Sequence, residues 1–380
     1  MWANGYLYRT TAVVASAQIT GTLTNWPALV SLSSANLKST ANGGAVQNTV
    51  TQTVGGRSLT VPADFFVTSD APGSTQITGV EFESYDATAG TALIWVKVAS
   101  AAVGSTIYIF YGNASVTTLQ GTPSGAWNSN YLGVWHLPDG TTLDASDSTT
   151  HGNNGTNHSA TAATGKIDGG VASNGGGSQY ISMGANVTSL HPTPALTVQI
   201  WCKPLSATQN NFAAIIAQDY SNPRGSPFSS YKLGLNFSNG GQYCFEVGAN
   251  GTSDINTNSG VSFSNGTWAH VVGSYNSGTI TVYVNGVKKA TAASGGFIGY
   301  TSSGDFRISG NSVGGEQVNA AVDEARVMNV AVSDAWVAAD YNNQSAPGTF
   351  WTITYDETNV SPPIGKIGGA STAVSRAANW

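Results

Sequence analysis

Alternation of apolar and polar residues is clearest between residues 268 and 344, where strand-length runs are separated by tight-turn sequences. The string WAHVVGSYNSGTITVYVNGVKK contains two such runs, joined at residues 276–278 (Asn-Ser-Gly). The second run ends at residues 285–286 (Asn-Gly), a pair that favours the positive φ angles of two-residue hairpin turns. This part of the chain therefore predicts consecutive β-hairpins.

Short apolar runs also fill the first third of the chain. They include WPALVSL (26–32), ADFFVTS (63–69), GVEFESYD (79–86), ALIWVKV (92–98) and STIYIFYGN (105–113). In the last two runs both alternating faces are apolar, as expected of central strands that are covered on both sides. We predict an all-β domain at residues 1–118. The stretch LQGTPSGAWNSN (119–130) lacks apolar periodicity and predicts a linker.

One short helix and a C-terminal tail complete the predicted elements. In SDAWVAADYNN (333–343), Ser333 suits the N-cap and Asp334 suits the positive end of the helix dipole. From Pro347 the pattern weakens, and we predict an extended tail over residues 346–380. Two interpretations of the tail stay open. It is either a frayed terminus or an arm that docks on a neighbouring subunit, because its apolar residues, Trp380 among them, are unfavourable in water.

The order of elements over residues 131–345 resembles the concanavalin A-like, laminin G-like jelly-roll family. The resemblance rests on YLGVWHLPDG, ALTVQIWCKP, the paired runs that begin at Trp268, and VDEARV before the helix. Residues 1–118 resemble a domain of unknown function that often precedes such domains in bacterial surface and phage proteins, through TNWPALVSL, IWVKV and IYIFYGNAS. The resemblance implies two β-sandwiches in series. It also implies a family that mostly binds ligands, with only some branches that cut them.

The composition of the chain limits the classes of partner that it can bind. At 380 residues, with 41% hydrophobic residues, the chain is long and apolar enough for two buried cores. Only 9% of residues are charged, the net charge is −6, and no basic cluster exceeds residues 288–289 (Lys-Lys). Nucleic acid is therefore an unsuitable partner, since its binding needs a positive stripe. The sequence contains no run of 18 consecutive apolar residues, so it predicts no membrane-spanning helix. The N-terminus lacks signal-peptide features, so we expect either a removed signal or another route, such as phage assembly.

Motifs for catalysis are missing from the second domain. Jelly-roll glucanases commonly place their carboxylates as Glu-x-Asp-x-x-Glu, and the nearest pattern, Glu81-Phe-Glu83-Ser-Tyr-Asp86, lies in the first domain. We interpret it as solvent-facing positions on a half-buried strand. Asp323 and Glu324 are adjacent, so in a regular strand they point to opposite faces. Without Gly-x-Ser-x-Gly or a zinc spacing among the histidines, we predict that the protein is not an enzyme. A glycoside hydrolase with an unfamiliar site remains an alternative.

Calcium is the metal that the sequence favours. Asp144 and Asp147 lie in a polar loop after the first strand of the second domain, and Asp323 lies near its last strand. Calcium prefers several carboxylate and carbonyl oxygens, which such loops supply, and the resemblance to laminin G-like domains implies a rim site. The alternative is that these aspartates only form turns. Cys202 and Cys244 fall on dissimilar strand faces and favour free thiols, although an even count leaves a disulfide open.

A sugar site is predicted from aromatic residues on polar strand faces and loops. Trp201 shares the more polar face of strand 196–202 with Gln199, and the loop AQDYSNPRGSPFSSY adds Tyr220, Arg224 and Tyr231. Sugar binding asks for an exposed aromatic platform beside hydrogen-bonding groups, so we predict a ligand site at these five residues. The alternative for Trp201 is packing under a loop.

Together these features predict a non-enzymatic, surface-displayed structural or adhesion protein. The leading hypothesis is a phage virion appendage or capsid-decorating protein on the virion surface, with a jelly roll that binds a cell-surface glycan. Its tail would contact other virion or surface proteins, or a further copy in a homo-oligomer. The alternative is a secreted bacterial adhesin, or a carbohydrate-binding module of a polysaccharide-processing protein, at the cell surface.

Overall fold

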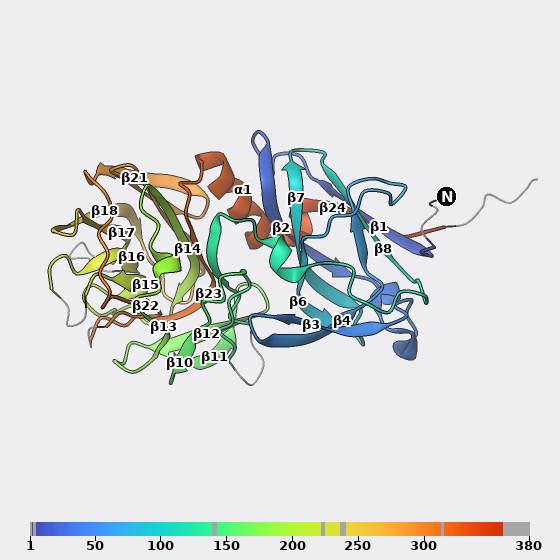
Figure 1. The fold of residues 1–380 in the computed structure, drawn as a ribbon, viewed down its shortest axis with the longest axis horizontal. Helices are drawn as coiled ribbons and strands as arrows, with labels where there is room; N and C mark the ends of the chain where they lie inside the picture. The colour runs from blue at the N-terminus through green and yellow to red at the C-terminus, as the bar shows by residue number, and fades with distance from the viewer. Residues whose placement is uncertain are drawn as a thin grey trace, which may run out of the picture.

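The computed structural model describes residue 2 and residues 5–138, 143–221, 225–235, 241–312 and 315–359. Two β-sandwich domains lie in series, and a helix packs between them (Figure 1). The predicted all-β class with a short C-terminal helix is therefore confirmed. In the described part of the chain, no helix has the length and apolar character needed to cross a membrane.

Two sheets form the N-terminal sandwich. One has the order β24 (Trp351–Thr358), β1 (Tyr8–Val14), β8 (Thr106–Tyr111) and β5 (Phe66–Thr68). The other has the order β2 (Leu23–Ser33), β7 (Thr91–Ala101) and β6 (Val80–Asp86). A hairpin and three short 3-10 helices complete the domain: β3 (Thr49–Val54), β4 (Arg57–Pro62), η1 (Ala35–Leu37), η2 (Thr40–Asn42) and η3 (Pro123–Ala126). The alternate apolar positions of β7 and β8 meet in one buried core, as the doubly apolar runs predict.

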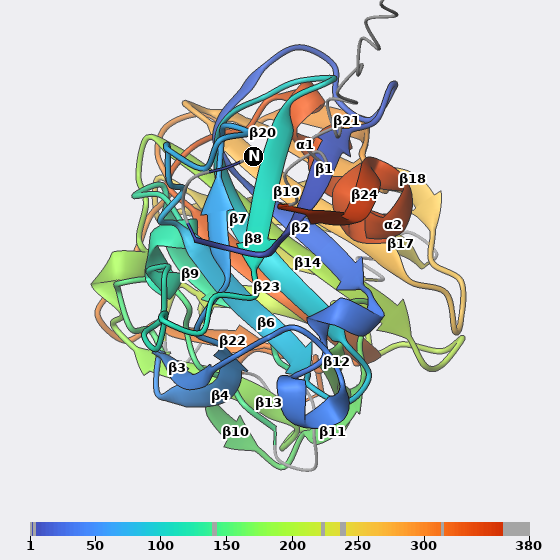
Figure 2. The same ribbon diagram turned by 90° about the vertical axis from the view of Figure 1, so that its right-hand side faces the viewer.

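The predicted tail is wrong for residues 346–359. These residues form α2 (Pro347–Phe350) and β24, and β24 pairs antiparallel with β1 from Trp351 to Thr358 (Figure 2). The sequence WTITYDET alternates, and Trp351 is buried in the N-terminal core while Thr352 and Thr354 are exposed. This short period-2 pattern is the signal of a strand, so the N-terminal domain is completed by the end of the chain. Residues 360–380 of the predicted arm lie outside the described residues.

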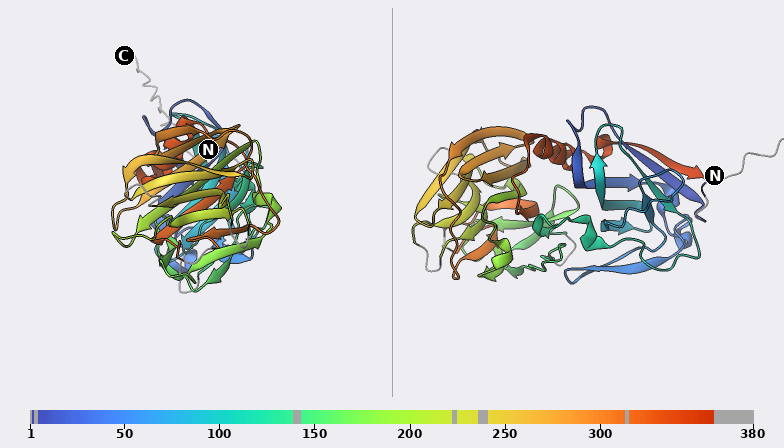
Figure 3. Two further views of the ribbon diagram at one scale, coloured as in Figure 1. Left: turned by 90° about the vertical axis from the view of Figure 1, so that its left-hand side faces the viewer. Right: turned by 45° about the horizontal axis from the view of Figure 1, so that its top comes forward.

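The second domain is a jelly roll of two packed sheets. Within the described residues, the outer sheet has the order β10 (Thr156–His158), β13 (Tyr180–Ala185), β22 (Asp305–Ile308), β15 (Ala214–Asp219), β16 (Ser229–Leu235), β17 (Gln242–Ala249) and β18 (Ser253–Ser262). The inner sheet has the order β11 (Thr161–Thr164), β12 (Gly169–Asn174), β23 (Asn319–Met328), β14 (Ala195–Pro204), β19 (Ala269–Asn276), β20 (Thr279–Val284) and β21 (Val287–Ala293), and β9 (Tyr131–Trp135) also pairs with β23. A 3-10 helix, η4 (Thr188–Leu190), follows β13. Figure 3 (left) looks onto the outer sheet, which faces away from the N-terminal domain.

The predicted hairpins and helix are confirmed. Strands β19, β20 and β21 are joined by turns at Ser277-Gly278 and Asn285-Gly286, and all four turn residues have positive φ. Helix α1 (Asp334–Ser345) begins after Ser333, whose hydroxyl accepts a hydrogen bond from the backbone N–H of Trp336. The two cysteines are buried and free.

Helix α1 and the segment between the domains hold the two sandwiches together. The side chain of Asn343 bonds both the backbone N–H and the carbonyl of Leu29 in β2, while Gln344 bonds a side chain of the inner sheet. The predicted linker, residues 119–130, contains η3 and buries Trp127 against Trp95 of β7. The face of the inner sheet that points away from the jelly-roll core is therefore covered by α1 and by the N-terminal domain.

Candidate functional site

The predicted sugar platform is buried. Trp201 is 2% exposed, and its indole Nε1 donates to Oε1 of Gln344 in α1 at 2.7 Å. Gln199 is buried beside it, and Tyr231 is buried in the jelly-roll core, where its hydroxyl donates to the carbonyl of Leu190 at 3.0 Å. The prediction of a ligand site at these three residues is therefore wrong, because α1 covers the polar strand face that carries Trp201.

The two remaining residues of that prediction lie in the loop between β15 and β16. Tyr220 is half-buried, and its backbone carbonyl accepts a hydrogen bond from the hydroxyl of Thr301. Arg224 lies outside the described residues. The structure thus does not bring the five predicted residues together on one surface.

The three predicted calcium ligands are held by other groups. The carboxylate of Asp147 accepts four hydrogen bonds, among them the backbone N–H groups of Val134 and Asn153. Oδ1 of Asp144 accepts from the N–H two residues on, as in a turn. Oδ2 of Asp323 accepts from two backbone N–H groups at 2.7 and 2.8 Å. These contacts satisfy Asp147 most fully, whereas Oδ1 of Asp323 has no hydrogen-bond partner; the ligand set and calcium binding both stay predictions.

An open pocket lies on the outer sheet instead. It has a volume of about 380 Å³, and we call it the outer-sheet pocket. Its lining residues combine aromatic, charged and amide side chains: Phe212, Phe228, Lys232, Glu246, Asp254, Asn256 and Glu316. A pocket of similar size in the N-terminal domain, about 420 Å³, is lined mostly by hydroxyl and aliphatic side chains and contains no aromatic residue.

Three side chains form a row across the floor of the outer-sheet pocket. Lys232 of β16 lies opposite Glu246 of β17, and Glu246 lies opposite Asn256 of β18. Residues opposite each other in neighbouring strands project from the same face, so strand pairing alone aligns the row. Nζ of Lys232 is 3.3 Å from Oε1 of Glu246, an ion pair with little solvent exposure.

Two phenylalanine rings stand at the pocket with unusual exposure. Phe212 is 37% and Phe228 is 47% exposed. The backbone N–H of Phe228 donates to Oδ1 of Asp254 in β18, which fixes this loop against the sheet. Nζ of Lys232 is 5.9 Å from the centre of the Phe212 ring. Apolar ring faces beside fixed polar groups are the chemistry of a small-molecule site.

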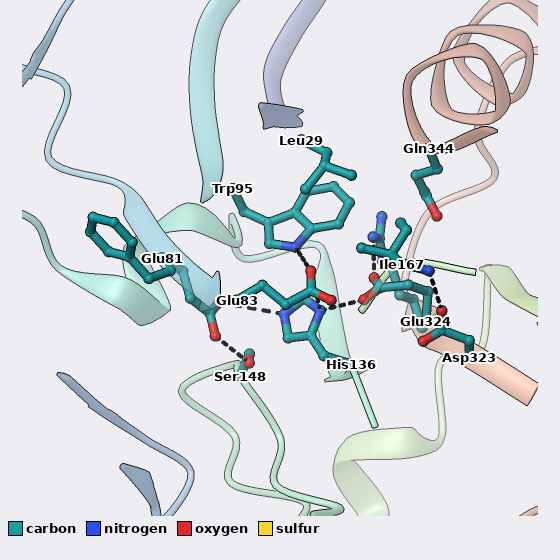
Figure 4. A network of polar contacts seen from close by, with 12 residues as sticks. Leu29, Glu81, Glu83, Trp95, His136, Ser148, Ile167, Asp323, Glu324 and Gln344 are labelled. Carbon is teal, nitrogen blue, oxygen red and sulfur yellow. Dashed lines mark hydrogen bonds and ion pairs between the residues drawn. The ribbon is translucent and has the colours of Figure 1, made fainter. Parts of the chain in front are cut away.

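A second constellation is buried where the two domains meet, and we call it the interdomain network. Figure 4 shows Glu83 of β6, His136 after β9 and Glu324 of β23 pointing toward one another. His136 Nδ1 is 2.6 Å from Glu324 Oε1 and 3.6 Å from Glu83 Oε2, and its Nε2 is 3.6 Å from Glu81 Oε2. Arg326 donates to the other oxygen of Glu324 at 2.6 Å.

Hydrogen bonds from indole and hydroxyl groups hold the carboxylates of Glu81 and Glu83 in place. Trp95 Nε1 donates to Glu83 Oε2, while Trp127 Nε1 and the hydroxyl of Ser148 donate to the two oxygens of Glu81, each at 2.6 Å. Glu81 and Glu83 are therefore buried, and their interpretation as solvent-facing residues is wrong. The network lies between two folded domains, a burial that the strand pattern alone does not reveal.

A β-bulge explains the part of the network on β23. The register of β23 against β14 shifts between Gln199 and Trp201, and Glu324 has φ of 53°. The extra residue breaks the alternation, so Asp323 and Glu324 both enter the buried interface instead of opposite faces. The prediction that they point to opposite faces is wrong for this reason.

Burial and mutual charge set the protonation of the network. Burial lowers the pKa of His136, but the charges of Glu324, Glu81 and Glu83 outweigh it and raise that pKa well above its usual value. Burial, together with the charge of Glu324, raises the pKa of Glu83 to about 8. Burial likewise raises the pKa of Asp340 to about 6, against the effect of Arg326. Protons and positive charges thus compensate closely spaced carboxylates.

Sequence reasoning missed both constellations, for different reasons. The alternation of QYCFEVG does place Glu246 on the face opposite Tyr243, so the sequence offered a signal for the pocket floor. The exposure of Phe212 and Phe228 depends on loops and has no sequence signal. The partners of His136 come from distant strands, and nothing local brings them together.

Comparisons with known proteins agree with the fold. Residues 174–338 match the model of the concanavalin A-like lectin/glucanases superfamily, and residues 72–126 match a domain of unknown function, DUF2341. The resemblance that the sequence motifs indicated is therefore confirmed. No curated protein matches the chain.

Three solved structures are similar to parts of the chain at low sequence identity and with TM-scores below 0.5. Domain 4 of AbnA, an extracellular arabinanase from Geobacillus stearothermophilus solved with arabinotriose, has a TM-score of 0.44 and 19% identity, over 56% of this chain and 98% of that one. The binding domain of Paraclostridial Mosquitocidal Protein 1 has a TM-score of 0.42 and 15% identity, over 56% and 52%. The receptor-binding domain of botulinum neurotoxin type G has a TM-score of 0.40 and 13% identity, over 57% and 52%.

Proposed function

We propose that the protein binds a saccharide in the outer-sheet pocket and has no catalytic activity of its own. The observation that carries the proposal is the pair of exposed phenylalanine rings beside the polar row Lys232, Glu246 and Asn256. An apolar ring face packs on the C–H face of a sugar, while the ammonium, carboxylate and amide groups bond its hydroxyls. The match to the lectin/glucanases superfamily supports this ligand class.

A glycan array followed by calorimetry on its best ligands tests the proposal. Phe228→Ala is expected to weaken binding about tenfold, since aromatic contacts are worth about 1 kcal/mol each. Phe297→Ala is the matched control, because Phe297 is 57% exposed and does not line the pocket. Saccharide affinity that is unchanged in both Phe228→Ala and Phe212→Ala would contradict a site at this pocket.

The same samples test the absence of catalysis. Glu246, Asp254 and Glu316 are carboxylates of the pocket, and glycoside hydrolysis uses two such groups. We expect the bound saccharide to be recovered intact after prolonged incubation. Release of new reducing ends that Glu246→Gln or Glu316→Gln abolishes would show a glycoside hydrolase instead.

We further propose that the protein displays this pocket on the surface of a phage particle. Two features support display: few charged residues, and a described N-terminus that lies at the end opposite the outer sheet (Figure 1). Asn359 bonds the carbonyl of Trp2, so the described C-terminal end lies there too. Mass spectrometry of purified particles is expected to detect the protein. Detection only in a bacterial surface or secreted fraction would favour the adhesin alternative.

A further inference from the structure

The strongest unassigned feature is the centre of the interdomain network. One ligand-type atom each from Glu83, His136 and Glu324 lies within 4.8 Å of the others, and all three side chains are buried. Glu83 belongs to the N-terminal domain, whereas His136 and Glu324 belong to the jelly roll. Among the described residues this is the one group of three acidic, histidine or cysteine side chains with such spacing.

Two buried atoms of this group have no hydrogen-bond partner. Oε1 of Glu83 is unpaired although Oε2 accepts from Trp95, and Nε2 of His136 has only Glu81 at 3.6 Å. A buried polar atom without a partner is costly, and it is costly here whether Glu83 carries a proton or a charge. Oε1 of Glu83 belongs to the carboxylate that Figure 4 shows directed at His136 and Glu324.

Charge also favours a cation. Around His136 the network contains the carboxyl groups of Glu81, Glu83, Glu324, Asp323 and Asp340, all buried. The permanent positive charges are Arg326 and, at the edge near Asp323, Lys166. Buried carboxylates without a compensating charge are unfavourable. The carboxylates that Arg326 and Lys166 do not neutralise must therefore bind protons or a metal ion.

The outer contacts are those that orient metal ligands in proteins. Trp95 holds Glu83, Arg326 holds Glu324, and Glu81 lies beside the second nitrogen of His136. A carboxylate behind a ligating imidazole fixes the tautomer and raises the basicity of the ring. Such support is present here for each of the three side chains.

We propose that Glu83, His136 and Glu324 bind one divalent transition-metal ion, such as Zn²⁺ or Mn²⁺, that joins the two domains. Imidazole with carboxylates suits these ions, whereas calcium prefers oxygen ligands alone. The 2.6 Å separation of His136 Nδ1 and Glu324 Oε1 widens to about 3 to 3.5 Å when both atoms lie 2.0–2.2 Å from one ion with octahedral or tetrahedral geometry. Since the site is enclosed, the ion enters as the protein folds.

Elemental analysis of the full chain tests this proposal. The protein is unfolded, refolded with Zn²⁺ or with Mn²⁺, and dialysed against metal-free buffer. About one ion per chain is expected to remain, and the melting temperature is expected to rise relative to protein refolded with EDTA. Protein that refolds fully with either ion and retains none overturns the proposal, and the network then holds protons only.

Variants locate the ion. Glu83→Gln keeps the size and one oxygen of the side chain, and we expect it to lose most of the bound metal. His158→Ala, which removes an exposed histidine of the outer sheet, is expected to keep it. A second measurement covers variants that fold poorly: Co²⁺-refolded wild type should show visible d–d absorption with nitrogen and oxygen ligation. Metal retained equally by folded Glu83→Gln and by His136→Gln would place the ion elsewhere and overturn the proposal.

Discussion

The two faces of the jelly roll each carry an ion pair, yet the pairs lie in opposite settings. On the inner sheet, Arg326 and Glu324 are sealed between the two domains, with guanidinium and carboxylate 2.6 Å apart. On the outer sheet, Lys232 and Glu246 are 3.3 Å apart on the floor of an open pocket. The inner pair stabilises an interface, whereas the outer pair remains within reach of a ligand. The coverage of a face, more than its residue types, decides which role a charge has.

Removing the inner cation is expected to have the largest effect. Arg326→Ala leaves Glu324 and Asp340 buried without their guanidinium, so the free energy of unfolding should fall by about 3 to 5 kcal/mol. The matched control is Arg307→Ala on the outer sheet, where Arg307 pairs with Asp305 nearer solvent. We expect that control to cost less, about 1 to 2 kcal/mol, since it leaves one carboxylate, that of Asp305, without its cation instead of two. Equal losses of unfolding free energy in the two variants, measured by urea denaturation, would show that the two faces do not differ in this way.

Lowering the pH should also destabilise the folded protein through the inner face, at His270. Burial, aided by the charge of Arg326, lowers the pKa of His270 to about 3, so the folded protein holds this ring neutral. The unfolded chain takes up the proton at its ordinary pKa of about 6.5, so stability is lost as pH falls from there toward 3. The His270 contribution should amount to about 2 kcal/mol between pH 7 and pH 5.

The measurement for His270 is a difference between two proteins. Asp340, 3.7 Å away, has a pKa raised to about 6 by burial and therefore acts in the opposite direction. Urea denaturation of wild type and His270→Gln at several pH values separates the two contributions. An acid loss of the same size in the variant would show that His270 does not cause it.

The contrast between the faces also marks the limit of sequence analysis. Local signals were sufficient for the hairpin turn at Asn285-Gly286 and for the N-cap at Ser333, because turn and cap preferences act within a few residues. Strand alternation placed Trp201 on a polar face, but a helix more than 130 residues later covers that face. Which face is covered depends on contacts between distant segments, and a single sequence does not contain them.

Irregular backbone set a second limit. The bulge at Glu324 directs two adjacent acidic side chains into the same buried interface, and no residue type nearby requires a bulge. The strand at residues 351–358 is a different case. Its alternation is visible in WTITYDET, and the same period-2 criterion that identified the other strands identifies it.

On the outer face, loss of the cation should weaken both binding and stability. Lys232→Met leaves the carboxylate of Glu246, which has little solvent exposure, without its cation on the pocket floor, so we expect a cost of about 1 to 3 kcal/mol in unfolding free energy. Saccharide affinity should fall about tenfold, since a charged hydrogen bond to a ligand hydroxyl is lost. Calorimetry and urea denaturation on the same variant measure both quantities. A stability loss as large as that of Arg326→Ala would place both pairs in the same class.

The smallest effect is expected where an ion pair lies on the surface. Lys288 Nζ and Asp334 Oδ2 are 2.6 Å apart, but both side chains are exposed, and Asp334 also accepts a hydrogen bond from the hydroxyl of Tyr283. Lys288→Ala should therefore change the free energy of unfolding by less than about 0.5 kcal/mol, and added salt should remove the difference. Urea denaturation at low and high ionic strength measures it. A salt-resistant loss above about 1 kcal/mol would mean that the short N–O distance outweighs solvent exposure, contrary to the ranking of these ion pairs.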